Sequence, residues 1–167
     1  GCDFVKFQKR NPDICVPSNE KRKTKTTPWG KMSYLDYKWK IEFDRSDYDE
    51  IDDYCAKKKI KWFASVWDED SVDFMQKYTD TIKIPSALLT HHALGEYARK
   101  KNKFLMLSTG MSNESDIDAA VASYSPDLLF HTNSTYPCPI DELNLGYIKT
   151  LLKKHPSKII GYSGHEF

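Results

Sequence analysis

The chain has 167 residues, of which 40% are hydrophobic, and its formal net charge is +1, as in an ordinary soluble single domain. This near balance of acids and bases argues against a general nucleic-acid-binding protein, which would carry a strongly basic domain or stripe. No segment approaches the roughly 20 apolar residues that a membrane span needs, and no signal-peptide pattern is present. We therefore expect a cytoplasmic protein with neither nucleic acid nor membrane as a partner.

Short apolar runs alternate with amphipathic stretches, which is typical of strand–helix units around a parallel sheet. The predicted strands are Phe4–Gln8, Trp62–Val66, Thr81–Ile84, Phe104–Ser108, Leu128–Thr132 and Lys158–Tyr162. The predicted helices are Ser46–Lys59, Glu69–Tyr78, His91–Lys101, Asn113–Tyr124 and Leu145–Lys154. Ser46 and Ser112 are the predicted N-caps of the first and fourth helices. Residues 11–37 show no clear strand, so we interpret them as a long loop of the kind that collects binding residues in a barrel.

Six predicted strands are fewer than the eight of a TIM barrel, which needs about 250 residues. We therefore expect residues 1–167 to be an incomplete TIM (β/α)8 barrel whose first and last strands are missing. An unclosed parallel sheet exposes two strand edges, so we expect this piece alone to be inactive and prone to aggregation. A complete, smaller open sheet is the alternative.

Polar side chains gather near the carboxyl ends of the predicted strands. Because side chains alternate along a strand, Lys6 and Gln8 share one face, and Lys83 opposes its apolar neighbours. The same interpretation places four more residues on the polar face, namely Ser65, Ser108, His131 and Ser163. For His131 the alternative is a core residue that holds the loop carrying Tyr136. Polar groups from six strands are thus predicted to point in one direction at one end.

Lys6 and Lys83 indicate a bound ligand, because an unpaired ammonium costs several kcal/mol to bury. A structural salt bridge is the alternative, but no predicted strand supplies an inward Asp or Glu. We therefore favour a bound anion, and two lysines with several hydroxyls suit a phosphate. His165 lies just beyond the last strand and would point into the barrel mouth. Its position is equally compatible with a functional role and with that of an ordinary histidine without a function.

The four cysteines form no CxxC pair, so a structural zinc site is not expected. We interpret them as thiols of a reducing compartment. Cys138 lies between two prolines, but no His or other base precedes it at a recognisable spacing, so we do not assign it as a nucleophile.

Six short motifs follow one another along the chain. They are VKFQKR at Val5–Arg10, TPWG at Thr27–Gly30, YLDY at Tyr34–Tyr37, LSTGM at Leu107–Met111, TYPCP at Thr135–Pro139 and GYSGHE at Gly161–Glu166. In order and spacing these motifs resemble the catalytic barrel of the N-acetylneuraminate (sialic acid) synthase family. Because the resemblance covers essentially the whole chain, chance does not account for it.

The resemblance implies an enzyme that condenses phosphoenolpyruvate with N-acetylmannosamine, beside a divalent Mn²⁺ or Mg²⁺ ion, to form N-acetylneuraminate and phosphate. The residues implied around phosphoenolpyruvate are Lys6, Ser65, Lys83, Ser86, Ser108, Ser134 and Ser163. Gln8 and Tyr136 are implied to hold the sugar, and His165 matches one of two metal-ligand histidines. Lys6, Gln8, Lys83 and His165 are then the catalytic residues. The resemblance also implies a homodimeric parent, with a C-terminal antifreeze-like domain outside this chain.

Two positions depart from the family pattern. Ser134 stands where many members have Asn, and Leu88 stands where many have a Glu or Asp near the sugar. The missing carboxylate leaves a legionaminic or pseudaminic acid synthase as an alternative. A Schiff-base aldolase with Lys6 or Lys83 as the amine, and a noncatalytic phosphosugar-binding domain, are further alternatives.

Overall fold

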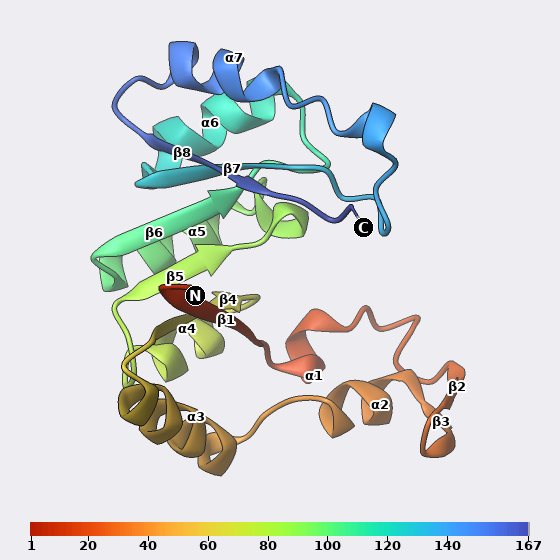
Figure 1. Ribbon diagram of the computed structural model, residues 1–167. Helices are drawn as coiled ribbons and strands as arrows, with labels where there is room; N and C mark the ends of the chain where they lie inside the picture. The colour runs from red at the N-terminus through yellow and green to blue at the C-terminus, as the bar shows by residue number, and fades with distance from the viewer. Residues whose placement is uncertain (167) are drawn as a thin grey trace. The chain divides into compact units, whose positions relative to one another are not determined.

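The computed structural model describes residues 1–166 and divides the chain into two compact units, Gly1–Tyr78 and a second unit from Thr79 onward. In both units parallel strands alternate with helices (Figure 1). This is the repeating element of a (β/α)8 barrel, so the predicted alternation is confirmed. Within residues 1–166, no helix is long and apolar enough to cross a membrane.

The first unit is built on two parallel strands. Its elements are β1 (Phe4–Lys9), α1 (Pro12–Cys15), β2 (Thr24–Thr27), β3 (Gly30–Ser33), α2 (Tyr34–Lys40), α3 (Arg45–Lys58), β4 (Lys61–Val66) and α4 (Glu69–Met75). β1 pairs with β4, and the register places Lys6 opposite Phe63 and Gln8 opposite Ser65. Tyr48 of α3 is fully buried, and its hydroxyl donates to the Gln8 carbonyl at 2.7 Å. The helix therefore fixes the carboxyl end of β1.

The second unit contains four parallel strands in the order β5-β6-β7-β8. Its elements are β5 (Thr81–Ile84), α5 (His92–Lys101), β6 (Phe104–Ser108), α6 (Glu114–Tyr124), β7 (Leu128–Thr132), α7 (Tyr147–Lys154) and β8 (Ile159–Ser163), with short 3-10 turns at Ser86–Leu88 and Ile140–Glu142. Ile82, Leu105 and Leu129 are fully buried, as expected for strands covered on both faces. Gly95 of α5 packs against the Tyr124 ring of α6, where a methyl group would collide with the ring.

The prediction that residues 11–37 contain no strand was wrong. Thr24–Thr27 and Gly30–Ser33 pair as an antiparallel hairpin, and a short helix, Pro12–Cys15, precedes it. Gly30 has a φ of 97°, a conformation that favours glycine, and Thr27 Oγ1 donates to the Gly30 carbonyl at 2.8 Å. These Lys- and Thr-rich strands have no apolar face, so their sequence lacks the alternation of apolar and polar residues that predicts a strand.

Two predicted N-caps were also wrong. Asp44 caps α3 and Asn113 caps α6, each through a reciprocal capping box with a carboxylate three residues later. Ser46 instead donates its hydroxyl to Asp44 Oδ1 at 2.7 Å. Because Asp, Asn and Ser are nearly equivalent N-caps, the sequence did not distinguish them.

Candidate active site

Hydroxyl groups crowd around Gly110 at the carboxyl end of β6. The Ser86 Oγ accepts a hydrogen bond from the Gly110 backbone N–H at 3.1 Å. A methyl group on Gly110 would collide with the Oγ atoms of both Ser134 and Ser86, and it would lie 3.0 Å from the Thr132 carbonyl. Two of the serines that the resemblance implies around phosphoenolpyruvate therefore meet at one backbone position, where a larger residue would have to displace them.

The strand register places the predicted inward residues of the second unit on one face. Lys83 is level with Met106 on β6, two residues before Ser108, and Ser163 is level with Thr132. Thr132 Oγ1 lies 3.4 Å from Ser108 Oγ. The predicted orientation is thus confirmed for Lys83, Ser108 and Ser163. Lys83 is buried, and its Nζ lies 5.0 Å from the centroid of the Phe130 ring, where a cation–π interaction contributes to holding it.

His131 does not belong to this face, so that prediction was wrong. It is level with Tyr162 and lies one residue out of phase with Phe130 and Thr132. Its ring stacks on Tyr162, and Nε2 lies 2.8 Å from the Leu143 carbonyl. His131 therefore anchors the loop that carries Ser134 and Tyr136, which confirms the alternative prediction for this residue.

His165 and Tyr136 lie together at the end of β8. Their rings stack with centroids 3.9 Å apart, and His165 Nδ1 lies 2.5 Å from the Asn133 carbonyl. That carbonyl can only accept, so Nδ1 carries a proton, and in the neutral ring Nε2 is the atom with the lone pair. A histidine held by a backbone carbonyl in this way is suited to bind a metal ion.

The surroundings of His165 fit one ligand of the divalent ion that the family resemblance implies. Within residues 1–166, however, no group of three or more His, Cys, Asp or Glu side chains is placed to hold a metal ion. Any further ligands would therefore have to come from outside these residues or from bound substrate and water.

A cavity of about 510 Å³ opens in the second unit between the loops that follow β6 and β7. Gly110, Thr132, Ser134, Glu142 and Tyr147 are among the residues that line it. Of the predicted site residues, Ser134 is the one that borders this space. The volume is within the range of small-molecule sites.

In the first unit, Lys6, Gln8 and Ser65 share one face, as predicted. Ser65 is buried, whereas Lys6 is exposed, so the argument from a buried charge does not apply to Lys6. The surrounding protein nonetheless lowers the pKa of Lys6 from its ordinary value by partial desolvation.

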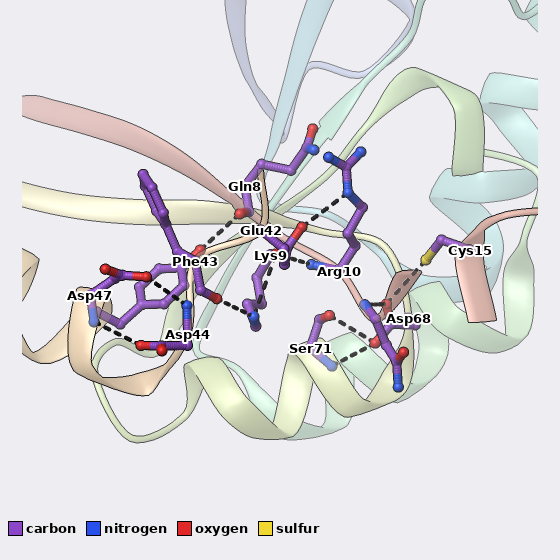
Figure 2. A network of polar contacts seen from close by, with 12 residues as sticks. Gln8, Lys9, Arg10, Cys15, Glu42, Phe43, Asp44, Asp47, Asp68 and Ser71 are labelled. Atoms are coloured by element: carbon purple, nitrogen blue, oxygen red, sulfur yellow. Dashed lines mark hydrogen bonds and ion pairs between the residues drawn. The ribbon is translucent and has the colours of Figure 1, made fainter. Parts of the chain in front are cut away.

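Two carboxylates that the sequence analysis missed hold the chain beyond β1 (Figure 2). Glu42 Oε1 accepts from the Arg10 backbone N–H, and Oε2 accepts from Arg10 Nε, both at 3.0 Å. Asp68 Oδ2 accepts from the Asn11 backbone N–H at 2.6 Å and from the Cys15 thiol at 3.1 Å. Burial, followed by this contact with Asp68, raises the pKa of Cys15 to about 12, which makes the thiol unreactive.

Comparisons with known proteins find related sequences along the whole chain. The sequence profile of the NeuB family matches residues 1–167. The chain is 32% identical, over 99% of its length, to an N,N'-diacetyllegionaminic acid synthase of Campylobacter jejuni, of which it covers 52%. It is 30% identical to the human N-acetylneuraminate-9-phosphate synthase, again over 99% of the chain and 48% of that protein. The chain thus spans about half the length of these relatives.

The fold likeness to solved structures is equally extensive. The N-acetylneuraminic acid synthetase of Leptospira borgpetersenii, solved in complex with citrate, superposes with a TM-score of 0.85 at 26% identity, over 98% of this chain and 55% of that one. A spore coat polysaccharide biosynthesis protein E of Chromobacterium violaceum gives 0.83 at 28% identity, over 100% of this chain and 50% of that one. These similarities confirm the predicted fold class, an incomplete TIM barrel.

Proposed function

The chain belongs to the NeuB family, and from this premise we propose that the intact protein is a sialic-acid-type synthase that joins phosphoenolpyruvate to an N-acetylated amino sugar. The observation that carries the proposal is the family match along the whole of residues 1–167. N-acetylmannosamine is the proposed sugar and N-acetylneuraminate the proposed product.

The hydroxyl cluster supports a phosphate site in the second unit. Ser86 and Ser134 flank the Gly110 backbone, and Ser108 lies on the same strand face as Lys83. Hydroxyls donate hydrogen bonds to phosphate oxygens, while a lysine supplies compensating charge. In this proposal Lys83 and Lys6 neutralise the phosphate and the carboxylate of phosphoenolpyruvate, so that two anionic groups can approach the sugar.

The proposed reaction forms one carbon–carbon bond, forms one carbon–oxygen bond to the oxygen of water, and breaks the bond between the former enol carbon and the bridging oxygen of phosphate. The methylene carbon of phosphoenolpyruvate attacks the aldehyde carbon of the open-chain sugar, whose oxygen takes a proton. Positive charge then develops on the former enol carbon, and water adds there. Loss of phosphate from this adduct leaves a 2-keto sugar acid. The contribution of Lys6 and Lys83 is to position the reactants and stabilise charge.

His165 Nε2 is the proposed protein ligand for a divalent ion. Such an ion, when bound, supplies Lewis-acid polarisation of the aldehyde. The Asn133 carbonyl and the Tyr136 ring together hold the His165 imidazole in place for this ion. Gln8 and Tyr136 are the proposed sugar contacts.

A legionaminic-type synthase is a second candidate, and two observations favour it. The relative with 32% identity is an N,N'-diacetyllegionaminic acid synthase. In addition, Leu88 lies in the 3-10 turn directly after β5, where many family members have a carboxylate near the sugar. An apolar side chain there favours a sugar with fewer free hydroxyl groups.

The test is a condensation assay of the intact protein with phosphoenolpyruvate, Mn²⁺ and a panel of N-acetylated sugars, in which phosphate and 2-keto acid are both measured. Equal amounts of the two products support the synthase, and the preferred sugar separates the two candidates. Borohydride treatment in the presence of pyruvate is the companion experiment. A covalent adduct on Lys6 or Lys83 would show a Schiff-base aldolase instead.

A further inference from the structure

Arg10 lies directly beyond β1, two residues after Gln8. Figure 2 shows the Gln8 and Arg10 side chains directed to the same side of the strand, while Lys9 extends to the opposite side. There Lys9 Nζ donates to the Phe43 carbonyl at 2.7 Å and lies 4.9 Å from the centroid of the Phe74 ring. Arg10 therefore continues the face that carries Lys6 and Gln8.

The Arg10 side chain is 12% exposed, and the Glu42 side chain that pairs with it is 3% exposed. A guanidinium has five N–H donors, of which Nε supplies one. Nε is bonded to Glu42, but neither Nη atom donates a hydrogen bond to any atom of residues 1–166. The side-chain amide of Gln8 likewise makes no hydrogen bond within the described part of the chain. Two neighbouring polar groups are thus held in place with unused donors.

The charge of Arg10 is already offset by the Glu42 carboxylate at 3.0 Å. Such a guanidinium does not need an anion to be stable, but it still needs hydrogen-bond acceptors for its outer edge. This distinguishes Arg10 from the lysines on the same strand faces, whose charges suit an anionic ligand. Neutral acceptors, such as carbonyl and hydroxyl oxygens, are the better match for Arg10.

We infer that Arg10 is a specificity-determining residue whose Nη edge donates hydrogen bonds to the neutral oxygens of the N-acetylated amino sugar, beside Gln8. The inference rests on the proposed function and adds to it a sugar contact from the loop after β1. Glu42 acts through Arg10, because it fixes both the backbone N–H and the Nε of that residue.

Arg99 provides a matched control within the same chain. It too pairs with a carboxylate, since Nη1 donates to Asp127 Oδ2 at 2.6 Å. Its other outer nitrogen, Nη2, donates to the carbonyls of Asn102 and Lys103 at 2.6 and 2.7 Å. Both Nη atoms of Arg99 therefore donate hydrogen bonds inside the protein, whereas neither Nη atom of Arg10 does within residues 1–166.

The experiment measures the affinity of the intact protein for N-acetylmannosamine and for phosphoenolpyruvate separately by calorimetry, together with turnover and unfolding temperature. Arg10→Met should weaken sugar binding roughly 10- to 100-fold, the scale of hydrogen bonds from a charged group, and leave phosphoenolpyruvate binding within about twofold. Arg10→Lys should not restore sugar binding, because it keeps the charge but loses the planar fork. Arg99→Met should lower the unfolding temperature and leave sugar affinity unchanged.

Three outcomes would overturn the inference. Weaker binding of phosphoenolpyruvate instead of sugar in Arg10→Met would make Arg10 an anion contact. Unchanged affinities with a lowered unfolding temperature would make it a structural partner of Glu42, and full recovery in Arg10→Lys would show that charge alone matters. Sugar affinity can be measured without turnover. A wild-type protein that binds the sugar but does not condense it would therefore contradict the proposed function, and the sugar affinities of the Arg10 variants would still test the inference. A wild-type protein that binds no sugar contradicts both.

Discussion

Replacing Gly110 by alanine tests the hydroxyl cluster directly. The added methyl group would collide with the Oγ atoms of Ser134 and Ser86 and would lie 3.0 Å from the Thr132 carbonyl. Overpacking of this kind typically costs about 1–3 kcal/mol. The φ of Gly110 lies outside the left-handed region, so the cost arises from the contacts and not from the backbone conformation. We expect the free energy of unfolding to fall by this amount and phosphoenolpyruvate binding to weaken as the serines move apart.

Gly146→Ala is the matched control, because a methyl group there meets no atom within 4 Å and the residue has a helical φ of −57°. It should be neutral or slightly stabilising. The double variant Gly110→Ala with Ser134→Ala removes one colliding oxygen, so it should regain part of the stability without regaining the affinity. Stability is measured by urea unfolding and affinity by calorimetry with phosphoenolpyruvate. If Gly110→Ala unfolds like Gly146→Ala and binds normally, the cluster around Gly110 is neither tight nor part of the site.

Three other substitutions give independent tests. Lys83→Met should weaken phosphoenolpyruvate binding in the intact protein by roughly 2–3 kcal/mol, with little loss of stability, whereas normal binding with lower stability would show a structural ion pair. His165→Ala should abolish metal-dependent turnover but leave phosphoenolpyruvate binding mostly intact, and an unchanged Mn²⁺ affinity by calorimetry would remove His165 from the metal site. Partial burial opposes the ionisation of Asp127, but hydrogen bonds from the Leu105 backbone N–H and from Arg99 outweigh it and lower the pKa of this carboxyl. The stability that ionised Asp127 contributes is therefore present above the ordinary pKa of this carboxyl and is lost as pH falls through the lowered pKa of the folded state. Asp127→Asn should therefore make the free energy of unfolding less dependent on pH on the acid side. An unchanged pH profile of stability would contradict this.

The strands of the second unit could be predicted because their apolar runs are bounded by clear turns. Thr81–Ile84, Phe104–Ser108 and Leu128–Thr132 have the predicted bounds, and Lys158–Tyr162 differs from β8 by one residue at each end. Buried parallel strands read as continuous apolar sequence, which is a strong local signal. The hairpin of β2 and β3 gave no such signal because Thr24–Thr27 and Gly30–Ser33 are polar and mostly exposed.

The orientation of His131 shows where alternation within a single strand is insufficient. All of Leu128–Thr132 is apolar except its last two residues, so the strand alone does not say which of them faces the polar side. The pairing of Thr132 with Ser163 decides this, and that register is a property of two strands. A one-residue shift moves a side chain to the other face.

The contacts of Glu42 could not have been predicted from the sequence. Glu42 lies 32 residues from Arg10, and Asp68 lies 57 residues from Asn11, so neither pair has a characteristic local spacing. Both carboxylates satisfy backbone N–H groups of the segment that follows β1. Pairings of this kind depend on how the elements of the first unit pack, which only the folded structure reveals.

The most direct test of the proposed synthase follows the bridging oxygen of phosphoenolpyruvate. The intact protein would be supplied with the preferred N-acetylated sugar, Mn²⁺ and phosphoenolpyruvate labelled with ¹⁸O between carbon and phosphorus. Because water adds to the former enol carbon before phosphate leaves, the label should appear in phosphate, with one labelled phosphate for each 2-keto sugar acid formed. Label retained in the sugar acid, or phosphate released without sugar acid, would contradict the proposed condensation.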